Sequence, residues 1–134
     1  MSESSNKTNV KTLPIVGAFF RPPAQLILEN LATDTKLSLI ADPENPYDRN
    51  AVAVYLDFAD IPWNTISAIE DKLQSCGSSI EALAETKTIH VGFIPKEIAA
   101  VLRGRGFFSA EGSFQTTSTG KPLVKFVDSS KVVE

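Results

Sequence analysis

The chain has 134 residues, a formal net charge of −3 and a single cysteine. This length predicts one domain with a real core, and a content of 43% hydrophobic and 22% charged residues is ordinary for a globular protein. The charge argues against wholesale coating of nucleic acid, Cys76 alone excludes an internal disulfide, and no apolar run reaches membrane-spanning length. We expect a cytoplasmic protein without a membrane partner, and no cofactor or metal.

Four apolar stretches in the first half of the chain predict β-strands. They are residues 13–20, 24–30, 36–41 and 51–56. In the third stretch Leu37 and Leu39 share one face, which is the two-residue period of a strand. Gly17 inside the first stretch predicts a bulge or a close approach of another backbone.

Residues 42–50, Asp-Pro-Glu-Asn-Pro-Tyr-Asp-Arg-Asn, form a polar loop that runs directly into the fourth strand. Proline presets φ, and Asn and Asp side chains bond nearby backbone groups, so this composition predicts an ordered turn. One interpretation is that Asp48 and Asn50 only satisfy the local backbone. The other is that the loop is held rigid because it shapes a site.

Residues 57–88 differ from the rest because they predict helices and are acidic, with six carboxylates against one lysine between 57 and 85. An N-cap is expected at Asp60, and a second short helix is expected to start at the capping box around Ser79. The apolar residues of the first helix recur at helical spacing: Ile66, Ile69 and Leu73. We expect Trp63 to pack this insertion onto the body of the domain.

The second half of the chain returns to strands around one further helix. Strands are predicted at 88–94, 107–116 and 122–128. Pro95 favours a helix start, since its missing N–H is not needed there, and the glycine at 104 favours a helix end.

We therefore predict a mainly β fold with some α structure. The pattern of about six or seven short strands, with a short helix after Ile94 and the helical insertion at 57–88, favours a small Greek-key barrel or sandwich. A single domain is expected over residues 13–128, between a disordered leader at 1–12 and a tail at 129–134.

Basic residues are concentrated late in the chain, where residues 87–131 hold seven of them against three acidic ones. This distribution fits either a local phosphate-binding face or simple solvation. The segment Arg103-Gly104-Arg105 likewise fits a phosphate contact or a helix end with solvated charges.

Three stretches resemble motifs of the HIRAN domain. They are Ile15-Val16-Gly17 followed by aromatic residues, DPENPYDRNAVAV at 42–54, and VGFIPKEIA at 91–99. HIRAN domains occur at the N-terminus of certain SWI/SNF-type helicases and as stand-alone bacterial and phage proteins. The resemblance covers about residues 13–128, interrupted at 57–88, where the family usually has a short connection.

The resemblance implies a modified OB-like barrel that holds single-stranded DNA by a free 3′ end. The terminal base would lie among aromatic rings, and polar loop groups would bond the 3′ hydroxyl. By motif, Phe20 and Tyr47 look like the base-stacking pair. Phe93 stands where the family has an aromatic residue or histidine, and Phe19 where it can have a basic residue.

The remaining site residues implied by the resemblance are polar. Asn45 and Asp48 look like the loop contacts to the sugar terminus, and Lys96 looks like a phosphate contact. Arg21 follows the aromatic residues and can stand in for the basic residue that the family can have at the position of Phe19.

Three functions follow as hypotheses. The first is a non-enzymatic module that captures single-stranded DNA, with a separate helicase, nuclease or host protein as a further partner. The second is a bacterial or phage protein-interaction module that docks a partner through the acidic insertion. The third is a metal-dependent nuclease built on Asp42, Glu44 and Asp48, because paired carboxylates can hold magnesium.

Overall fold

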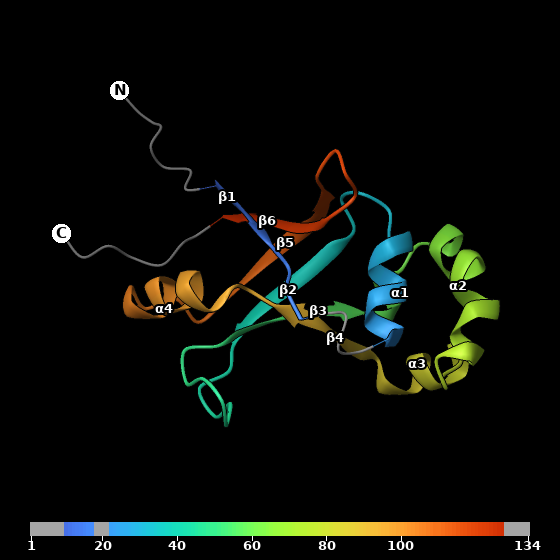
Figure 1. Cartoon of the computed structure of the whole chain (residues 1–134), viewed down its shortest axis with the longest axis horizontal. Helices are drawn as coiled ribbons and strands as arrows, with labels where there is room; N and C mark the ends of the chain where they lie inside the picture. Colours follow the sequence, from blue (N-terminus) through green and yellow to red (C-terminus); the bar gives the residue numbers. More distant parts are fainter. Residues whose placement is uncertain (1–9, 18–21, 128–134) are drawn as a thin grey trace.

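The computed structural model describes residues 10–17 and 22–127, which form a mixed α/β domain on one six-stranded sheet (Figure 1). The strands are β1 (Val10–Pro14), β2 (Lys36–Ala41), β3 (Val52–Asp57), β4 (Thr88–Phe93), β5 (Ser109–Thr116) and β6 (Pro122–Val127). The helices are α1 (Pro22–Asn30), α2 (Trp63–Ser75), α3 (Ile80–Thr86) and α4 (Lys96–Gly104), with a 3-10 turn η3 (Phe58–Asp60).

All neighbouring strands run antiparallel, in the order β1-β6-β5-β2-β3-β4. The two edges meet where Val16, just beyond β1, forms an isolated antiparallel bridge with Phe93 at the end of β4. The prediction of about six or seven strands is confirmed, but the described residues form a mixed α/β fold and not a mainly β one, because four α-helices accompany the sheet. The sheet is not a closed barrel, because a single bridge rather than a ladder joins its edges in the described part of the chain.

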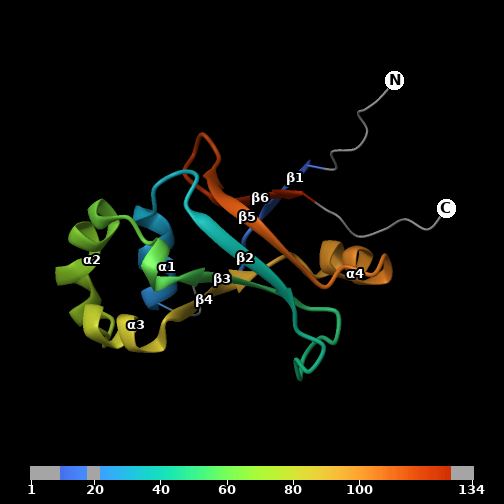
Figure 2. The ribbon, with the colours of Figure 1, turned by 180° about the vertical axis from the view of Figure 1, so that it is seen from behind.

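The core lies on one face of the central strands. Leu37 and Leu39 of β2 and Val54 and Leu56 of β3 alternate into it and are almost fully buried. Seen from behind, β2 and β5 cross the middle of the domain, with α1, α2 and α3 at one end and α4 at the other (Figure 2). The helices therefore sit at the two ends of the sheet and leave its middle to the strands.

The prediction of a strand at 24–30 is wrong, because these residues form most of α1. Ala24, Ile27 and Leu28 are buried, which is the spacing of one helical face. Three successive apolar residues fit a strand and a helix equally well over so short a stretch. The Asn30 side chain donates to the carbonyl of Leu26 at 2.9 Å, across one turn of helix. One of the seven expected strands is lost in this way.

The first strand begins earlier and ends earlier than predicted. β1 starts at Val10 and stops at Pro14, and the backbone then continues extended to the bridge at Val16. Its register with β6 pairs Val10 with Val127 and Pro14 with Leu123. The remainder of the predicted strand, at 18–20, lies outside the described residues.

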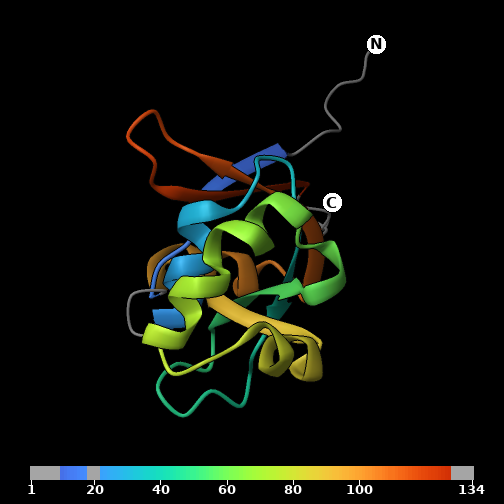
Figure 3. The same cartoon turned by 90° about the vertical axis from the view of Figure 1, so that its right-hand side faces the viewer.

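The helical insertion is confirmed, and it belongs to the core. Ile69 and Leu73 of α2 are fully buried in the same hydrophobic cluster as Ile27 of α1. The Thr65 hydroxyl donates to the backbone carbonyl of Asn30 at 2.8 Å, which joins α2 to the end of α1. Figure 3 shows α1, α2 and α3 gathered at one end of the domain. Removing this segment would therefore expose apolar surface.

Two local predictions about the insertion are wrong, and one is confirmed. Pro62 rather than Asp60 occupies the N-cap position of α2, while Asp60 ends η3. Trp63 is 75% exposed instead of packing on the body, although Ile66, one turn further along α2, is buried. Ser79 caps α3 as expected, and its Oγ accepts from the N–H of Ala82 at 3.1 Å.

The predicted helix after Ile94 is also confirmed, as α4. Pro95 occupies its N-cap position, and the Ala99 N–H bonds back to the Pro95 carbonyl at 2.8 Å. At the other end, Nη1 of Arg103 donates to the carbonyl of Phe107. This contact supports the interpretation of Arg103 as part of the helix end.

Gly92 lets the two edges of the sheet approach. Its φ is +157°, and a Cβ there would lie 2.7 Å from the carbonyl oxygen of Val16 and 2.6 Å from Cγ2 of Ile15. Real Cβ atoms do not come so close to other heavy atoms. Glycine at this position is therefore needed for the bridge between Val16 and Phe93.

We expect Gly92→Ala to lower the free energy of unfolding by about 1–3 kcal/mol, the usual cost of overpacking a close-packed site. Gly104→Ala is the matched control, because a Cβ at Gly104 would meet nothing within 4 Å. Chemical denaturation of both variants measures the difference. Equal stability of the two variants would contradict a required close approach at Gly92.

Candidate nucleic-acid interface

The loop between β2 and β3 is built around the side chain of Asn45. Its Oδ1 accepts from the backbone N–H groups of Tyr47, at 2.9 Å, and Asp48, at 3.1 Å. Its Nδ2 donates to Oδ2 of Asp42 at 3.3 Å. One amide side chain thus takes the place of backbone partners on both sides of the turn, which is how Asn orders a loop.

Asp48 orders the second half of the same loop. Its Oδ1 accepts from the N–H of Asn50 at 2.9 Å, and its backbone carbonyl accepts from the N–H of Ala51 at 3.0 Å. Asp42 and Ala51 then bond across the base of the loop at 2.8 Å. The predicted ordered turn is confirmed, although Asn50 contributes its N–H to these bonds and not its side chain.

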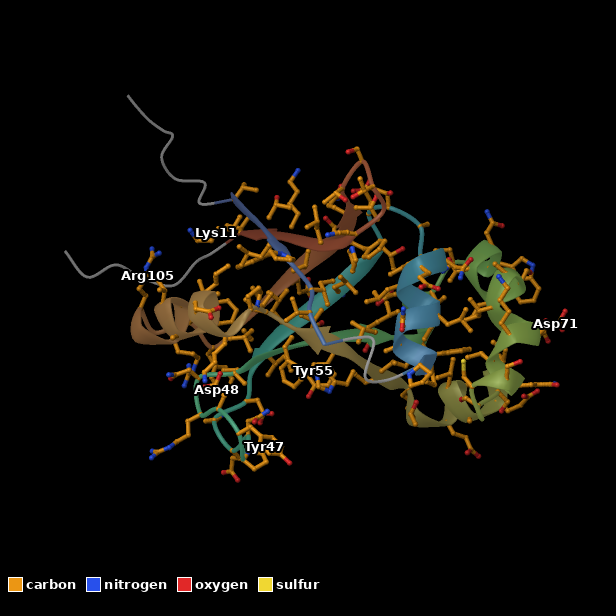
Figure 4. All side chains as sticks on the ribbon, viewed as in Figure 1. Lys11, Tyr47, Asp48, Tyr55, Asp71 and Arg105 are labelled. Carbon is orange, nitrogen blue, oxygen red and sulfur yellow. The ribbon has the colours of Figure 1, made fainter. Side chains whose placement is uncertain are left out.

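Tyr47 lies at the tip of this ordered loop and is 92% exposed (Figure 4). A tyrosine ring in water at the end of a hydrogen-bonded turn contributes little to the core. The backbone N–H of Tyr47 donates to the side chain of Asn45, so the backbone that carries the ring is ordered. Such a ring is available to stack against a flat ligand.

A β-bulge turns Phe93 toward the loop. β4 pairs with β3 in shifted register between Val54 and Tyr55, so that Tyr55 lies opposite His90 and Val54 opposite Gly92. The extra residue reverses the alternation, and a bulge of this kind re-aims the side chains that follow it. The rings of His90 and Phe93 consequently meet edge to face, with centroids 4.6 Å apart.

The ring of His90 lies in a row of aromatic rings with Tyr55 and Phe93. Its ring also lies 5.0 Å from that of Tyr55, and its Nε2 is 2.9 Å from the carbonyl oxygen of Gly92. In the tautomer with a proton on Nε2, this contact is a hydrogen bond across the bulge. His90 therefore packs against the Phe93 ring, and Tyr55 packs against His90.

The segment after β1 forms the third side of the site. The N–H of Val16 donates to the carbonyl of Phe93, and the N–H of Phe93 donates to the carbonyl of Val16, both at 2.8 Å. The side chain of Val16 is 41% exposed. The bridge therefore places an accessible apolar side chain next to the Phe93 ring.

These three segments enclose a cavity of about 330 Å³. Its polar and aromatic lining residues are Asn45, Tyr47, Asp48, Phe93 and Lys96. Its apolar lining residues are Val16, Ala51 and Ile94. An apolar floor with a few polar groups at the rim is the usual make-up of a ligand site of this size.

Lys96 supplies the positive charge at the rim. It is exposed at the start of α4, and no carboxylate lies within ion-pair distance of it among residues 10–17 and 22–127. The first N–H groups of a helix have no partner within the helix, and they favour an anion. Lys96 and the beginning of α4 thus offer a charge and N–H donors at the same edge of the cavity.

The structure brings together five of the eight predicted site residues, namely Asn45, Tyr47, Asp48, Phe93 and Lys96. Phe19, Phe20 and Arg21 lie outside the described residues. The hydrogen bonds of Asn45 and Asp48 that the structure shows are made within the loop, so their first role is to build the turn.

Sequence reasoning missed three lining residues, Val16, Ala51 and Ile94. All three lie inside the motifs quoted for the resemblance, within three residues of a predicted site residue. Each is apolar, and nothing in its spacing separates a residue that lines a cavity from one that fills the core. The position of the motif was the available signal.

Among the described residues, no three His, Cys, Asp or Glu side chains gather in a way that would hold a metal ion, and Asp42, Glu44 and Asp48 are included in this finding. Of the helices in the same part of the chain, none combines the length and the apolar character needed to cross a membrane.

One titratable group away from the cavity has a perturbed pKa. Lys36 on β2 forms an ion pair of 3.2 Å with Glu111 on β5. The hydrogen bond and the charge of Glu111, followed by the charge of Asp60, raise the pKa of Lys36 above its ordinary value. Lys36 therefore stays charged at neutral pH, and the pair only joins two exposed side chains.

Comparison with known proteins does not place this chain in a family, since no protein-family model, no curated protein and no solved structure matches it. The site is therefore interpreted from its own geometry.

Asn45→Ala removes the acceptor of two loop N–H groups, and we expect it to cost about 0.5–1.5 kcal/mol of stability for each lost hydrogen bond. Amide exchange at Tyr47 and Asp48 should accelerate. Asn50→Ala is the control, because its contribution to the loop is a backbone N–H that alanine retains. Unchanged exchange at both amides in Asn45→Ala would mean that the loop is ordered by something else.

Proposed function

We propose that this protein is a non-enzymatic module that binds single-stranded DNA at a 3′ end. The observation that carries the proposal is that one cavity is lined by Val16, by Tyr47 and by the stretch from Phe93 to Lys96, three segments that are far apart in the sequence. Rings, an apolar floor and an unpaired cation side by side are what a nucleotide requires.

Base stacking is the main source of affinity in this proposal. Each base stacked on an aromatic ring contributes about 1–3 kcal/mol, whatever its sequence. Tyr47 is fully available, and Phe93 presents its ring to the cavity from the other side. Val16 provides apolar surface between them. We propose Phe20 as a further stacking ring, with Phe19 beside it.

Lys96 neutralises the phosphate in this proposal, and the start of α4 adds N–H donors. Arg21 is proposed as a second cation. The second carboxylate oxygen of Asp48 and the remaining N–H of Asn45 Nδ2, whose other N–H donates to Asp42, are proposed to bond a terminal hydroxyl, because both residues line the cavity.

The acidic part of the chain does not oppose this reading. Asp71 in α2 lies at the opposite end of the molecule from Tyr47 and Asp48 (Figure 4). Exposed charges are largely screened beyond about 8–10 Å at physiological salt. The net charge of −3 therefore says little about the potential at the cavity.

The resemblance to HIRAN domains supports the same function, because the motifs that carry it supply the cavity walls. We propose that the sheet, whose edges meet at Val16 and Phe93, is an open, modified form of the OB-like fold of that family. A helicase or nuclease is proposed as a further partner.

Tyr47→Ala should weaken binding of a labelled single-stranded oligonucleotide by about 5- to 150-fold, the equivalent of one lost stacking contact. Fluorescence anisotropy measures it. Trp63→Ala is the matched control, since Trp63 is also an exposed aromatic residue but lies on the insertion. Equal loss of affinity in the two variants, or none in Tyr47→Ala, would remove this cavity as the binding site.

Recognition of the end is tested with the same oligonucleotide carrying a 3′ hydroxyl or a 3′ phosphate. We expect the hydroxyl form to bind about tenfold more tightly, because a phosphate would bring negative charge against Asp48 and is too bulky for a hydroxyl contact. Competition anisotropy gives the ratio. Equal binding of both forms would leave a strand-binding module that does not read the end.

A second candidate function is the docking of a basic protein on the insertion, and the exposure of Trp63 favours it. Glu70 and Asp71 are exposed on the same helix, so an aromatic ring and carboxylates are available together. Because the insertion carries core residues, point variants rather than a deletion separate this function from the first. Loss of a protein partner in Trp63→Ala, with DNA binding absent in the wild type, would establish it.

A further inference from the structure

A second and larger cavity adjoins the candidate interface. Its volume is about 580 Å³, and it lies between the segment Ile15–Gly17, helix α1 and the turn that joins β5 to β6. Its apolar floor is formed by Ile15, Val16 and Leu28. Gln25, Glu29 and Lys121 stand at its rim. The proposed function so far uses none of these rim residues.

Val16 lines both cavities, so they are neighbours separated by one side chain. Gly17 lies beside it, and a Cβ there would come within 3.6 Å of the Phe93 ring. Val16 is therefore the described residue at which the two cavities adjoin, with Gly17 next to it on the side of the second cavity. A strand bound in the first cavity can extend past Val16 into the second.

The rim of the second cavity has a definite chemistry. Nε2 of Gln25 donates to Oε2 of Glu29 at 3.2 Å, one turn apart on α1. This bond orients the carboxylate and leaves its other oxygen to accept a hydrogen bond from a ligand. On the opposite side, the Lys121 backbone N–H is already bonded to Thr117 Oγ1 at 3.0 Å, so only its ammonium is offered.

A carboxylate, an ammonium and an apolar floor match the three parts of a nucleotide. The floor suits a base, the ammonium of Lys121 suits its phosphate, and a carboxylate accepts from an amino group such as N4 of cytosine. A carboxylate also disfavours a carbonyl at the same place, as in thymine.

We propose that this cavity holds the penultimate nucleotide of the bound strand, with its phosphate toward Lys121 and the amino edge of its base toward Glu29. The inference rests on the proposed function, because it takes the terminal nucleotide to lie beside Tyr47. It adds a preference that the first cavity does not provide, namely cytosine over thymine at the penultimate position.

The test uses two oligonucleotides that differ only in dC or dT at the penultimate position. The wild type should bind the dC form about three- to tenfold more tightly, within the range for one base contact. Glu29→Gln should abolish this ratio, because an amide serves both bases. Free dCMP is the third probe, and it should bind far more weakly than the dC oligonucleotide.

Lys121→Ala should weaken both oligonucleotides about equally, by about three- to tenfold, since phosphate contacts carry no base information. Lys125→Ala is the matched control. Lys125 is an exposed lysine on the same hairpin, but it borders a different cavity together with Lys36 and Glu111. It should leave both affinities unchanged.

The outcomes separate the two proposals. Tight, Tyr47-dependent binding without a dC preference, and with equal effects of Lys121→Ala and Lys125→Ala, would overturn the second subsite and leave the proposed function intact. Absence of oligonucleotide binding in the wild type would overturn both. Binding of dCMP as tight as that of the oligonucleotide would show a free-nucleotide site instead.

Discussion

Two backbone hydrogen bonds between Val16 and Phe93 are the constraint on which the candidate site depends. They join the segment after β1, one edge strand of the sheet, to the end of β4, the other edge strand. Gly92 makes this possible, because any side chain there would collide with Ile15 and the Val16 carbonyl. The same bridge places Val16 between the two cavities. The bridge that joins the two edges of the sheet thus also positions the residues that line the two cavities.

The loop at the other side of the site illustrates how order without burial is achieved. The side chains of Asn45 and Asp48 accept hydrogen bonds from the backbone of the loop. The result is an ordered turn on which Tyr47 is exposed to water. A loop that is already ordered loses less conformational entropy when a ligand binds. Asn45 and Asp48 therefore have a structural role whether or not they also touch a ligand, and the same residues border the cavity.

The insertion contributes to the core as well as to the surface. Asp71 of α2 lies at the end of the molecule away from Tyr47 (Figure 4), and the apolar residues of α2 and α3 complete the core with α1. Thr65 secures that packing through its bond to Asn30. The insertion is thus part of the folded body, and its exposed Trp63 is a surface feature that the core does not need.

Elements whose propensity, capping and turn signals all indicate the same structure were predictable from the sequence alone. The alternation in 36–41 predicted β2, Pro95 marked the start of α4, Ser79 capped α3, and the Asn and Pro residues of 42–50 predicted the ordered turn. In each case the signal lies within a few residues of the feature, because turn chemistry, capping and strand period are local.

Packing between distant segments determined the features that local patterns could not predict. Residues 24–30 satisfy both periods, and packing against α2 made them a helix. Trp63 has the composition of a core residue, yet its position on the helix turned it to water. Val16, Tyr47, Phe93 and Lys96 became neighbours through strand pairing, a bulge and one bridge. Contacts between distant segments depend on how the sheet folds back on itself, and no local pattern of side chains contains that information.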